Sequence, residues 1–142
     1  HHADVTVAQL PWVDLQGPHS FGIEIINFSS QAGRRGEPNI VLYCSTKAAV
    51  ISVTQSLARE LAGDNIRVNA IGPGPTLQGG RQSADHFAKQ RAATVLERGA
   101  NPADIVAALG YFLDAPAITG QLLCVDGGQH LTWQTPDVLG VE

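Results

Sequence analysis

The chain has 142 residues, which suits a single domain, and its 44% hydrophobic and 15% charged residues are ordinary for a globular protein. The formal net charge is −4 and no basic stripe occurs, so the sequence lacks the electrostatic footprint of a nucleic-acid-binding protein. No apolar run approaches the roughly 18 residues of a membrane span and no signal peptide is visible, which indicates a cytoplasmic protein without a membrane partner.

The first elements in chain order are the hardest to predict. Residues 1–21 form a poorly readable N-terminal segment, in which residues 4–7 can form a short strand before prolines and glycines break any longer element. The β-branched apolar run at 23–28 predicts a buried strand, which ends at Ser29 and Ser30 in a glycine-containing turn.

A long helix and a second strand follow. The helix is predicted at about 41–62, where apolar residues recur at helical spacing, namely Val50, Val53, Leu57 and Leu61. The second strand is predicted at 66–71. The polar, glycine-rich stretch at 76–83 after it is typical of a mobile lid.

Two further helices and one strand complete the pattern. One helix should begin after Ser83, and another at Pro102, with Asn101 as its N-cap. The apolar face expected for this last helix consists of Ile105, Val106, Leu109, Phe112 and Leu113. A third buried strand is predicted at 121–125, before a tight turn at 126–128.

Strands that alternate with helices predict an α/β fold with a Rossmann-like, doubly wound parallel sheet. The three strands should lie side by side, joined by right-handed crossovers. A dinucleotide-binding sheet contains two βαβαβ halves, and this chain supplies one half's worth of strands. We therefore expect residues 1–142 to form a single, partial domain that lacks the N-terminal cofactor-binding βαβ units. The absence of methionine indicates a fragment, a processed chain or an incomplete sequence.

The first chemical signal is the pair Tyr43 and Lys47, a Y-x-x-x-K pattern near the start of the long helix. Residues four apart lie on one helical face, so the phenol and the ammonium can point into the same cleft. A tyrosine hydroxyl normally titrates near pH ~10, and a nearby positive charge favours the tyrosinate. A tyrosinate can take the proton of an alcohol as a hydride leaves. The spacing alone is more often a surface pair.

Context strengthens the signal, because Ser30 lies thirteen residues before Tyr43 at the end of a predicted buried strand. This arrangement resembles the short-chain dehydrogenase/reductase family, and the resemblance covers about residues 22–133. Five marks carry it in order: Ile25–Ser30, Tyr43 with Lys47–Ala49, Ile66–Gly74, Thr119–Gln121 and Val125–Gly128.

The resemblance implies an oxidoreductase that acts on a small-molecule substrate, with NAD or NADP as its cofactor. Tyr43 should be the acid/base, and Lys47 should favour the tyrosinate and bind the nicotinamide ribose. Ser30 should hydrogen-bond the substrate oxygen, with Ser29 as the neighbouring alternative.

The remaining implied contacts are with the cofactor. Pro73 and Gly74 should shape the loop against the nicotinamide, beside Tyr43 and Lys47. Thr76 is either a contact to the carboxamide or phosphates or an ordinary loop residue, because the preceding proline departs from the commoner family pattern. No metal site is expected, since the five histidines lack metal-ligand spacing, and the two cysteines should be buried and reduced.

The family's glycine-rich phosphate-binding loop has no counterpart before Ser30. Without a helix N-terminus for the pyrophosphate, the chain alone should be a poor enzyme or none. The strand at 23–28 should also become an open edge of the sheet. The competing hypothesis is a truncated or degenerate module with no catalysis of its own, which assembles with a partner chain.

Two subfamily resemblances conflict. Residues 29–37, with Tyr43 and Cys44, resemble polyol dehydrogenases. The stretches at 72–77, 81–83 and 126–133 look more like bacterial pteridine or dihydromonapterin reductases. The sequence therefore leaves the substrate open between a polyol, a ketone and a pterin.

The long helix carries a patch of small residues, namely Ala48, Ala49, Ser52, Ser56 and Ala58. Small residues let helices approach closely, and the family uses this helix in a subunit interface. We therefore expect a homodimer or homotetramer.

Overall fold

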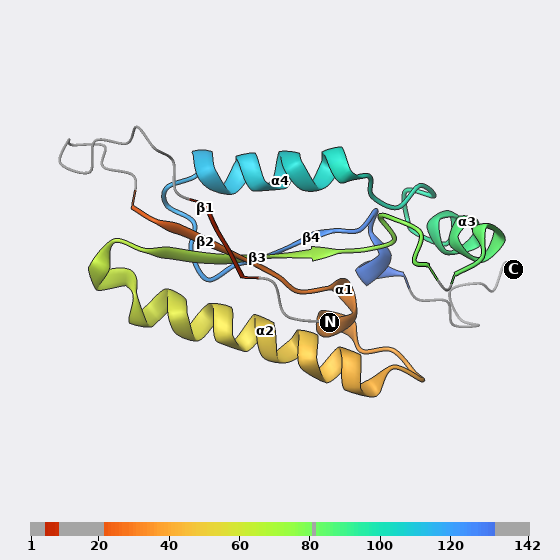
Figure 1. Cartoon of the computed structure of the whole chain (residues 1–142), viewed down its shortest axis with the longest axis horizontal. Helices are drawn as coiled ribbons and strands as arrows, with labels where there is room; N and C mark the ends of the chain where they lie inside the picture. Colours follow the sequence, from red (N-terminus) through yellow and green to blue (C-terminus); the bar gives the residue numbers. More distant parts are fainter. Residues whose placement is uncertain (1–4, 9–21, 81, 133–142) are drawn as a thin grey trace, which may run out of the picture.

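The structure is a computed structural model that describes residues 5–8, 22–80 and 82–132, the first of these as backbone only. Four strands form one sheet in the order β1-β2-β3-β4 (Figure 1). They are β1 (Val5–Ala8), β2 (Glu24–Phe28), β3 (Arg67–Pro73) and β4 (Leu122–Val125). β2, β3 and β4 are parallel to one another, whereas β1 pairs with β2 in the antiparallel direction.

Helices cover both faces of this sheet. α4 (Pro102–Asp114) lies on one face, and α2 (Val41–Glu60) lies on the other with the short α1 (Gln31–Arg35) (Figure 1). α3 (Ala84–Ala92) lies beyond the end of the sheet, and the 3-10 turns are η1 (Ala62–Asp64) and η2 (Gln129–Leu131). None of the described helices is long and apolar enough to cross a membrane.

The α/β fold and the three parallel strands predicted from the sequence are confirmed. The long helix ends at Glu60 rather than at 62, because the tighter turn η1 takes over. The predicted open edge at 23–28 is wrong, since β1 pairs along β2. Most of the segment 1–21 lies outside the described residues, and residues 5–8 are the part of it that the structure shows as a strand.

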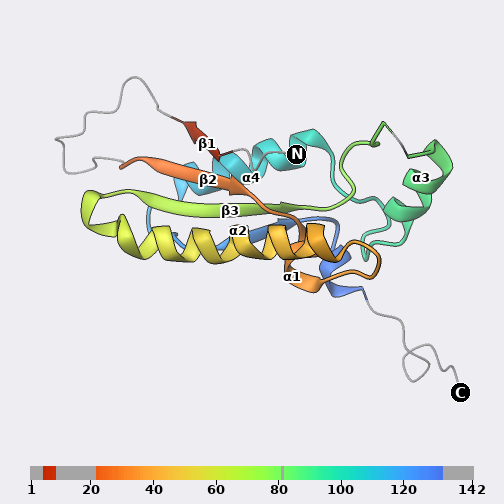
Figure 2. The same cartoon turned by 60° about the horizontal axis from the view of Figure 1, so that its bottom comes forward.

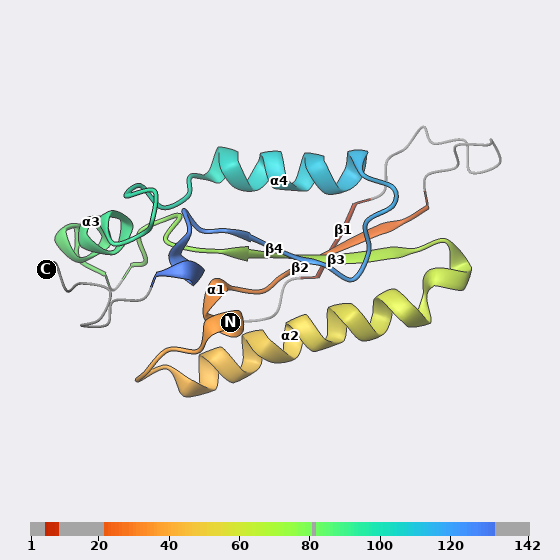
Figure 3. The same ribbon diagram turned by 180° about the vertical axis from the view of Figure 1, so that it is seen from behind.

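The two crossovers of the parallel strands have opposite hands. β2, β3 and β4 follow one another in a single direction across the sheet, yet α2 and α4 lie on opposite faces (Figure 3). Two right-handed crossovers in one direction would place both helices on the same face. The right-handed rule therefore holds for only one of them, and the sequence-based expectation is wrong for the other.

The layer between the sheet and α4 is an apolar core. Its buried members are Ile26, Ile71, Ala108 and Phe112, with Phe28, Ile105, Leu109, Ile118, Leu123 and Val125 packed around them. On α4, the residues at 105, 108, 109 and 112 follow the spacing of a single helical stripe. Val106, predicted for this stripe, is 65% exposed, so that part of the prediction is wrong.

The contact between α2 and the sheet is partly polar. The buried residues of α2 are Cys44, Thr54 and Ala58. The Asn27 amide donates to the Thr54 hydroxyl at 3.0 Å, which satisfies both groups inside the protein. Val53, predicted to face the sheet, is instead 49% exposed, and Ala58, predicted for the exposed small patch, is buried.

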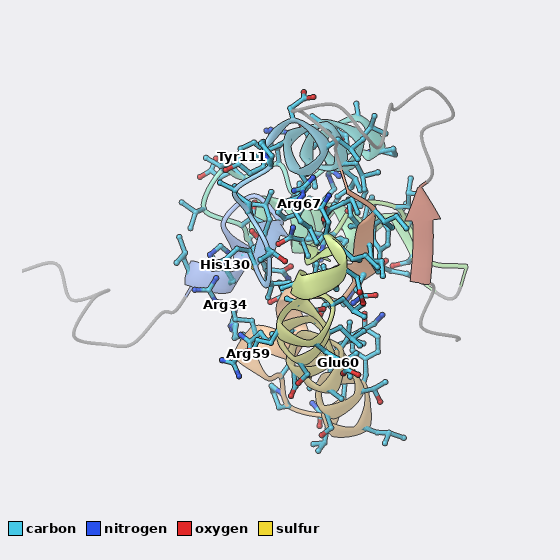
Figure 4. All side chains as sticks on the ribbon, turned by 90° about the vertical axis from the view of Figure 1, so that its left-hand side faces the viewer. Arg34, Arg59, Glu60, Arg67, Tyr111 and His130 are labelled. Atoms are coloured by element: carbon cyan, nitrogen blue, oxygen red, sulfur yellow. The ribbon has the colours of Figure 1, made fainter. Side chains whose placement is uncertain are left out.

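A buried ion pair ties the end of α4 to the sheet. Glu24 of β2 and Arg67 of β3 are paired in register, and their charged groups lie 2.9 Å apart (Figure 4). Burial raises the pKa of the Glu24 carboxyl, although the Asn69 amide and the guanidinium lower it in part. The guanidinium also donates to three backbone carbonyls at and beyond the end of α4, those of Phe112, Ala115 and Ile118.

α1 packs directly on α2 at Gly33. A Cβ at this position would lie 2.6 Å from the carbonyl carbon of Lys47 and 2.9 Å from the backbone nitrogen of Ala48. Both atoms belong to the backbone of a long helix, which cannot shift as the tip of a side chain can. The missing side chain of Gly33 therefore sets how closely the two helices approach.

Replacing Arg67 with methionine should destabilise the protein by about 3–5 kcal/mol, because it leaves a buried carboxylate without its partner and three carbonyls without a donor. Urea unfolding of the full gene product measures this loss. Arg59→Met is the matched control, since Arg59 is exposed on α2, and it should change stability by no more than about 0.5 kcal/mol. Equal effects of the two substitutions would contradict a bracing role for Arg67.

Adding one methyl group at Gly33 should destabilise the protein by about 1–3 kcal/mol, since the backbone of α2 has to move. The same change at Gly110 is the control, because Gly110 lies inside α4 with nothing within 4 Å of an added Cβ. Gly110→Ala should be neutral or stabilise by up to about 1 kcal/mol. Thermal melts of both variants decide the matter, and a neutral Gly33→Ala would show that the two helices can separate freely.

Candidate active site

The carboxyl ends of the parallel strands meet at one end of the sheet, where α1, α3 and η2 gather (Figure 2). Open α/β sheets bind their ligands outside these strand ends. Ser29 and Ser30 follow β2, Gly74 follows β3, and Asp126 follows β4. The structure thus brings Ser30, with its alternative Ser29, and Gly74 to the expected end of the sheet.

Two reciprocal hydrogen bonds join the end of β2 to α2. The Lys47 ammonium donates to the carbonyl oxygen of Phe28 at 3.0 Å, and the Ser29 hydroxyl donates to the backbone carbonyl of Lys47 at 2.8 Å. The Ser29 backbone amide also donates to Ile71 of β3 at 2.8 Å. Lys47 is therefore fixed relative to two strands of the sheet.

Ser30 and Ser29 differ in whether their hydroxyl protons are already donated in a hydrogen bond. The Ser30 oxygen accepts a hydrogen bond from the Ala32 amide as the N-cap of α1, which leaves its own proton available to another acceptor. The Ser29 proton is already given to the carbonyl of Lys47. Both side chains are buried, so a free donor here has to be met by a neighbouring polar group.

Tyr43 lies one helical turn before Lys47 on α2. The ammonium is 5.9 Å from the centre of the tyrosine ring, and the Tyr43 side chain is 46% exposed. The two side chains share a face, as the spacing predicts, but that face is open to solvent. Neither of the two described cavities, of about 380 and 390 Å³, is lined by Tyr43, Lys47 or Ser30.

The loop that leads into α2 is anchored by side chains. The Gln31 amide donates to the Glu37 carboxylate at 2.6 Å, and the Glu37 backbone amide donates to the sulfur of Cys44 at 3.2 Å. These contacts hold the first turn of α2, which carries Tyr43, against α1. Buried Cys44 thus has a local structural role, in keeping with the reduced state predicted for it.

The loop after β3 carries the other predicted cofactor contacts. Gly74 presses on Asp126, because a Cβ there would lie 2.6 Å from the Asp126 Cβ, and its amide donates to Val125 of β4. The Thr76 hydroxyl donates to the carbonyl of Gly74 at 3.1 Å. The Thr76 hydroxyl is thereby bonded within its own turn. Pro73 and Gly74 instead contact β4, since Pro73 pairs with Val125 and the Gly74 amide donates to the Val125 carbonyl.

Arg91 of α3 joins the two ends of the segment that begins with the predicted lid at 76–83. Its guanidinium donates to the carbonyls of Pro75 and Ala100 at 3.1 and 2.6 Å, and to the Asn101 side chain at 3.0 Å. The last turn of α3 is therefore tied both to the loop after β3 and to the start of α4. No sequence pattern marks Arg91, since its partners are mainly backbone carbonyls.

The predicted tight turn at 126–128 is confirmed. Gly127 and Gly128 have positive φ angles of 66° and 81°, which favour glycine. The Asp126 carboxylate accepts from the backbone amides of Gly128 and His130 at 2.9 and 2.8 Å, and it lies 2.8 Å from the His130 ring nitrogen Nδ1. These bonds fold η2 back onto the end of β4.

Comparisons with known proteins find similar sequences and structures along most of the chain. Residues 18–130 match the family model described as enoyl-(acyl carrier protein) reductase. A galactitol 2-dehydrogenase from Agrobacterium fabrum is 42% identical over 127 residues, which cover 78% of this chain and 49% of that enzyme.

Solved structures point the same way. FolM alternative dihydrofolate reductase 1 from Brucella canis, complexed with NADP, is 37% identical with a TM-score of 0.77, over 86% of this chain and 48% of that one. A short-chain dehydrogenase from Leptospira borgpetersenii with bound NAD+ is 36% identical with a TM-score of 0.65, over 75% and 44%.

The chain thus spans about half the length of the relatives and structures that it matches. The parallel sheet, the position of Tyr43 and Lys47 on α2 and the matched family model agree in one assignment: the chain belongs to the short-chain dehydrogenase/reductase family.

Proposed function

We propose that this chain forms the acid–base part of an NAD(P)-dependent oxidoreductase that interconverts an alcohol and a carbonyl. The observation that carries the proposal is the position of the Lys47 ammonium. It donates to the carbonyl of Phe28, two residues before Ser30, and it lies on the same helical face as Tyr43, 5.9 Å from the centre of its ring. Our proposal is that Ser30, Tyr43 and Lys47 together handle an alcohol oxygen and its proton.

Lys47 has capacity for two tasks at once. An ammonium group has three donors, and one of them is used by the carbonyl of Phe28. The others remain for the hydroxyl groups of a ribose. Its positive charge also lies 5.9 Å from the centre of the Tyr43 ring.

Ser30 and Tyr43 then divide the handling of the substrate oxygen. In the oxidative direction, Tyr43 takes the alcohol proton onto its phenolate oxygen. The Ser30 hydroxyl donates to the same substrate oxygen and stabilises the charge that develops on it. In the reductive direction, Tyr43 returns the proton to the newly formed alkoxide.

Bound NAD or NADP would supply or accept the hydride. The residues present fit the nicotinamide end of such a cofactor, because Lys47 keeps spare donors and Pro73 and Gly74 lie at the carboxyl end of β3, where open α/β sheets bind their ligands. Solved relatives were crystallised with NADP and with NAD+, which supports a nicotinamide cofactor here without a choice between the two. Thr76 remains a proposed cofactor contact. To donate a hydrogen bond to the cofactor, its hydroxyl would first have to release the carbonyl of Gly74.

Two substrate classes have support. Similarity to galactitol 2-dehydrogenase favours a polyol or the matching ketose, and similarity to an alternative dihydrofolate reductase favours a reduced pterin. Assays of the full gene product with NADH and NADPH, against polyols, ketoses and dihydropterins, separate the two. Turnover of none of these classes would leave the competing hypothesis, a module that assembles with a partner chain without catalysis of its own.

We also propose a cytoplasmic homodimer or homotetramer that uses α2 in its interface. Ala48, Ala49, Ser52 and Ser56 are exposed along this helix. The same helix exposes larger apolar side chains, with Val41 71%, Leu42 83% and Val53 49% exposed. A partner surface that covers them would bury apolar area, which favours association.

Tyr43→Phe should lower kcat by orders of magnitude and leave cofactor affinity nearly unchanged, because the hydroxyl acts mainly in the transition state. Lys47→Ala should reduce both, since it also contacts the ribose. Steady-state kinetics and cofactor titration measure the two effects. Tyr111→Phe is the control, because Tyr111 is exposed on α4, away from this site (Figure 4), and it should keep normal kcat. Normal kcat in Tyr43→Phe would exclude this tyrosine as the acid/base.

The two neighbouring serines form a second matched pair. Ser30→Ala should lower kcat by about 10²–10³-fold, the usual cost of removing one donor to a developing oxyanion. Ser29→Ala should cost mainly stability, about 1 kcal/mol for the lost bond to Lys47. Kinetics and melting temperatures of both variants test the assignment, and a larger loss of kcat in Ser29→Ala would reverse it.

A further inference from the structure

Three potential metal ligands lie together at the end of β4, on the side of η2. Cys124 is in β4, Asp126 follows it and His130 lies in η2, all within seven residues of sequence. One donor atom from each lies within 4.8 Å of the others. The glycine turn at 127–128 creates this proximity, because it folds η2 back onto the strand end.

The cluster is largely shielded from water. The Asp126 side chain is 1% exposed and that of His130 17%, while Cys124 is half-buried. All three line a cavity of about 380 Å³, which leaves space for a further ligand. Thiolate, carboxylate and imidazole are the three ligand types that zinc takes in proteins, and open zinc sites combine three of them with a water molecule.

The distances are close to those of a metal site. Donors around one tetrahedral zinc ion lie about 3.3–3.8 Å apart, given bonds of about 2.0–2.3 Å. The three side chains would have to close by about 1 Å, which is within the range of small side-chain rotations. The Asp126 carboxylate now lies 2.8 Å from Nδ1 of His130 in a hydrogen bond, so a metal would have to replace this bond and separate the two donors by about 0.5–1 Å.

The charges around the cluster also suit a divalent cation. Burial raises the pKa of the Cys124 thiol, so a metal would have to displace its proton; the thiolate and the Asp126 carboxylate would then carry two negative charges together. The one cation that contacts Cys124 in the described part of the chain is Arg34 of α1, whose guanidinium is 3.8 Å from the sulfur (Figure 4). Its side chain is exposed and this contact is long, so Arg34 can move aside as the metal approaches.

We infer that Cys124, Asp126 and His130 form a binding site for a zinc-type divalent cation. This differs from the sequence-based expectation of no metal site, which examined the spacing of the histidines alone. The site does not use Tyr43 or Lys47, although Asp126 packs against Gly74, one of the proposed cofactor contacts. Metal binding can nevertheless be measured without reference to the proposed oxidoreductase function. Bound metal would clamp η2 to β4 and, through the bond from Arg35 to the Gln129 carbonyl, brace α1.

Cobalt titration of the full gene product tests the inference directly. Co²⁺ bound by a thiolate absorbs in the near ultraviolet, whereas cobalt held by the histidines at the start of the chain gives no such band. We expect a thiolate band that saturates at one equivalent of Co²⁺ and disappears when Zn²⁺ is added. No thiolate band at millimolar Co²⁺ would overturn the site, whatever the variants do.

Four variants assign the ligands. Cys124→Ser should abolish the band, and His130→Gln should weaken cobalt affinity by at least about tenfold, the least that even an outer contact of a metal site costs. Cys44→Ser and His86→Gln are the controls, as the second cysteine and an exposed histidine of α3, and both should bind normally. A band that survives Cys124→Ser, is lost in Cys44→Ser, or is unchanged in His130→Gln would contradict the site, with circular dichroism confirming that each variant is folded.

Discussion

The reciprocal pair of hydrogen bonds between the end of β2 and α2 is the constraint on which the candidate site depends. Lys47 donates through its side chain to the last carbonyl of β2 and accepts through its own carbonyl from Ser29. A lysine side chain is otherwise flexible and loses entropy when it is ordered. Because both ends of this residue are held, the positive charge stays at the strand ends instead of moving into solvent. Tyr43, one helical turn earlier, therefore lies near a positive charge whose position is fixed.

Close packing of α1 on α2 supports the same arrangement. Gly33 leaves no room for a side chain over Lys47, and Ser30 begins the helix that makes this contact. Ser30 caps α1 through its oxygen, and the same hydroxyl keeps a proton that it can donate at the carboxyl ends of the strands. Stability and proposed chemistry therefore share residues, so substitutions there need kinetic and thermal measurements together.

Local patterns predicted the strands, the helices and the pair on α2, since alternation and spacing are properties of the sequence itself. The orientation of α2 was harder to predict, because the face that it turns inward includes a buried threonine, Thr54, whose hydroxyl accepts from Asn27 and donates to the carbonyl of Val50. Hydrophobic spacing selected Val53 for that face, and Val53 is half exposed. The crossover of opposite hand was beyond reach for a similar reason, since chain order does not state which face a helix takes.

Backbone partners explain most of what sequence analysis missed. Arg67 and Arg91 both bind carbonyl groups from distant segments, and no pattern of side chains marks a carbonyl in advance. The turn after β4 is the reverse case. Its aspartate and two glycines predict a tight turn, and that turn is the reason why a cysteine before it and a histidine after it become neighbours. The turn at 126–128 has a backbone role, and it also brings Cys124 and His130 close enough to bind one metal ion. The spacing between histidines alone does not indicate such a site.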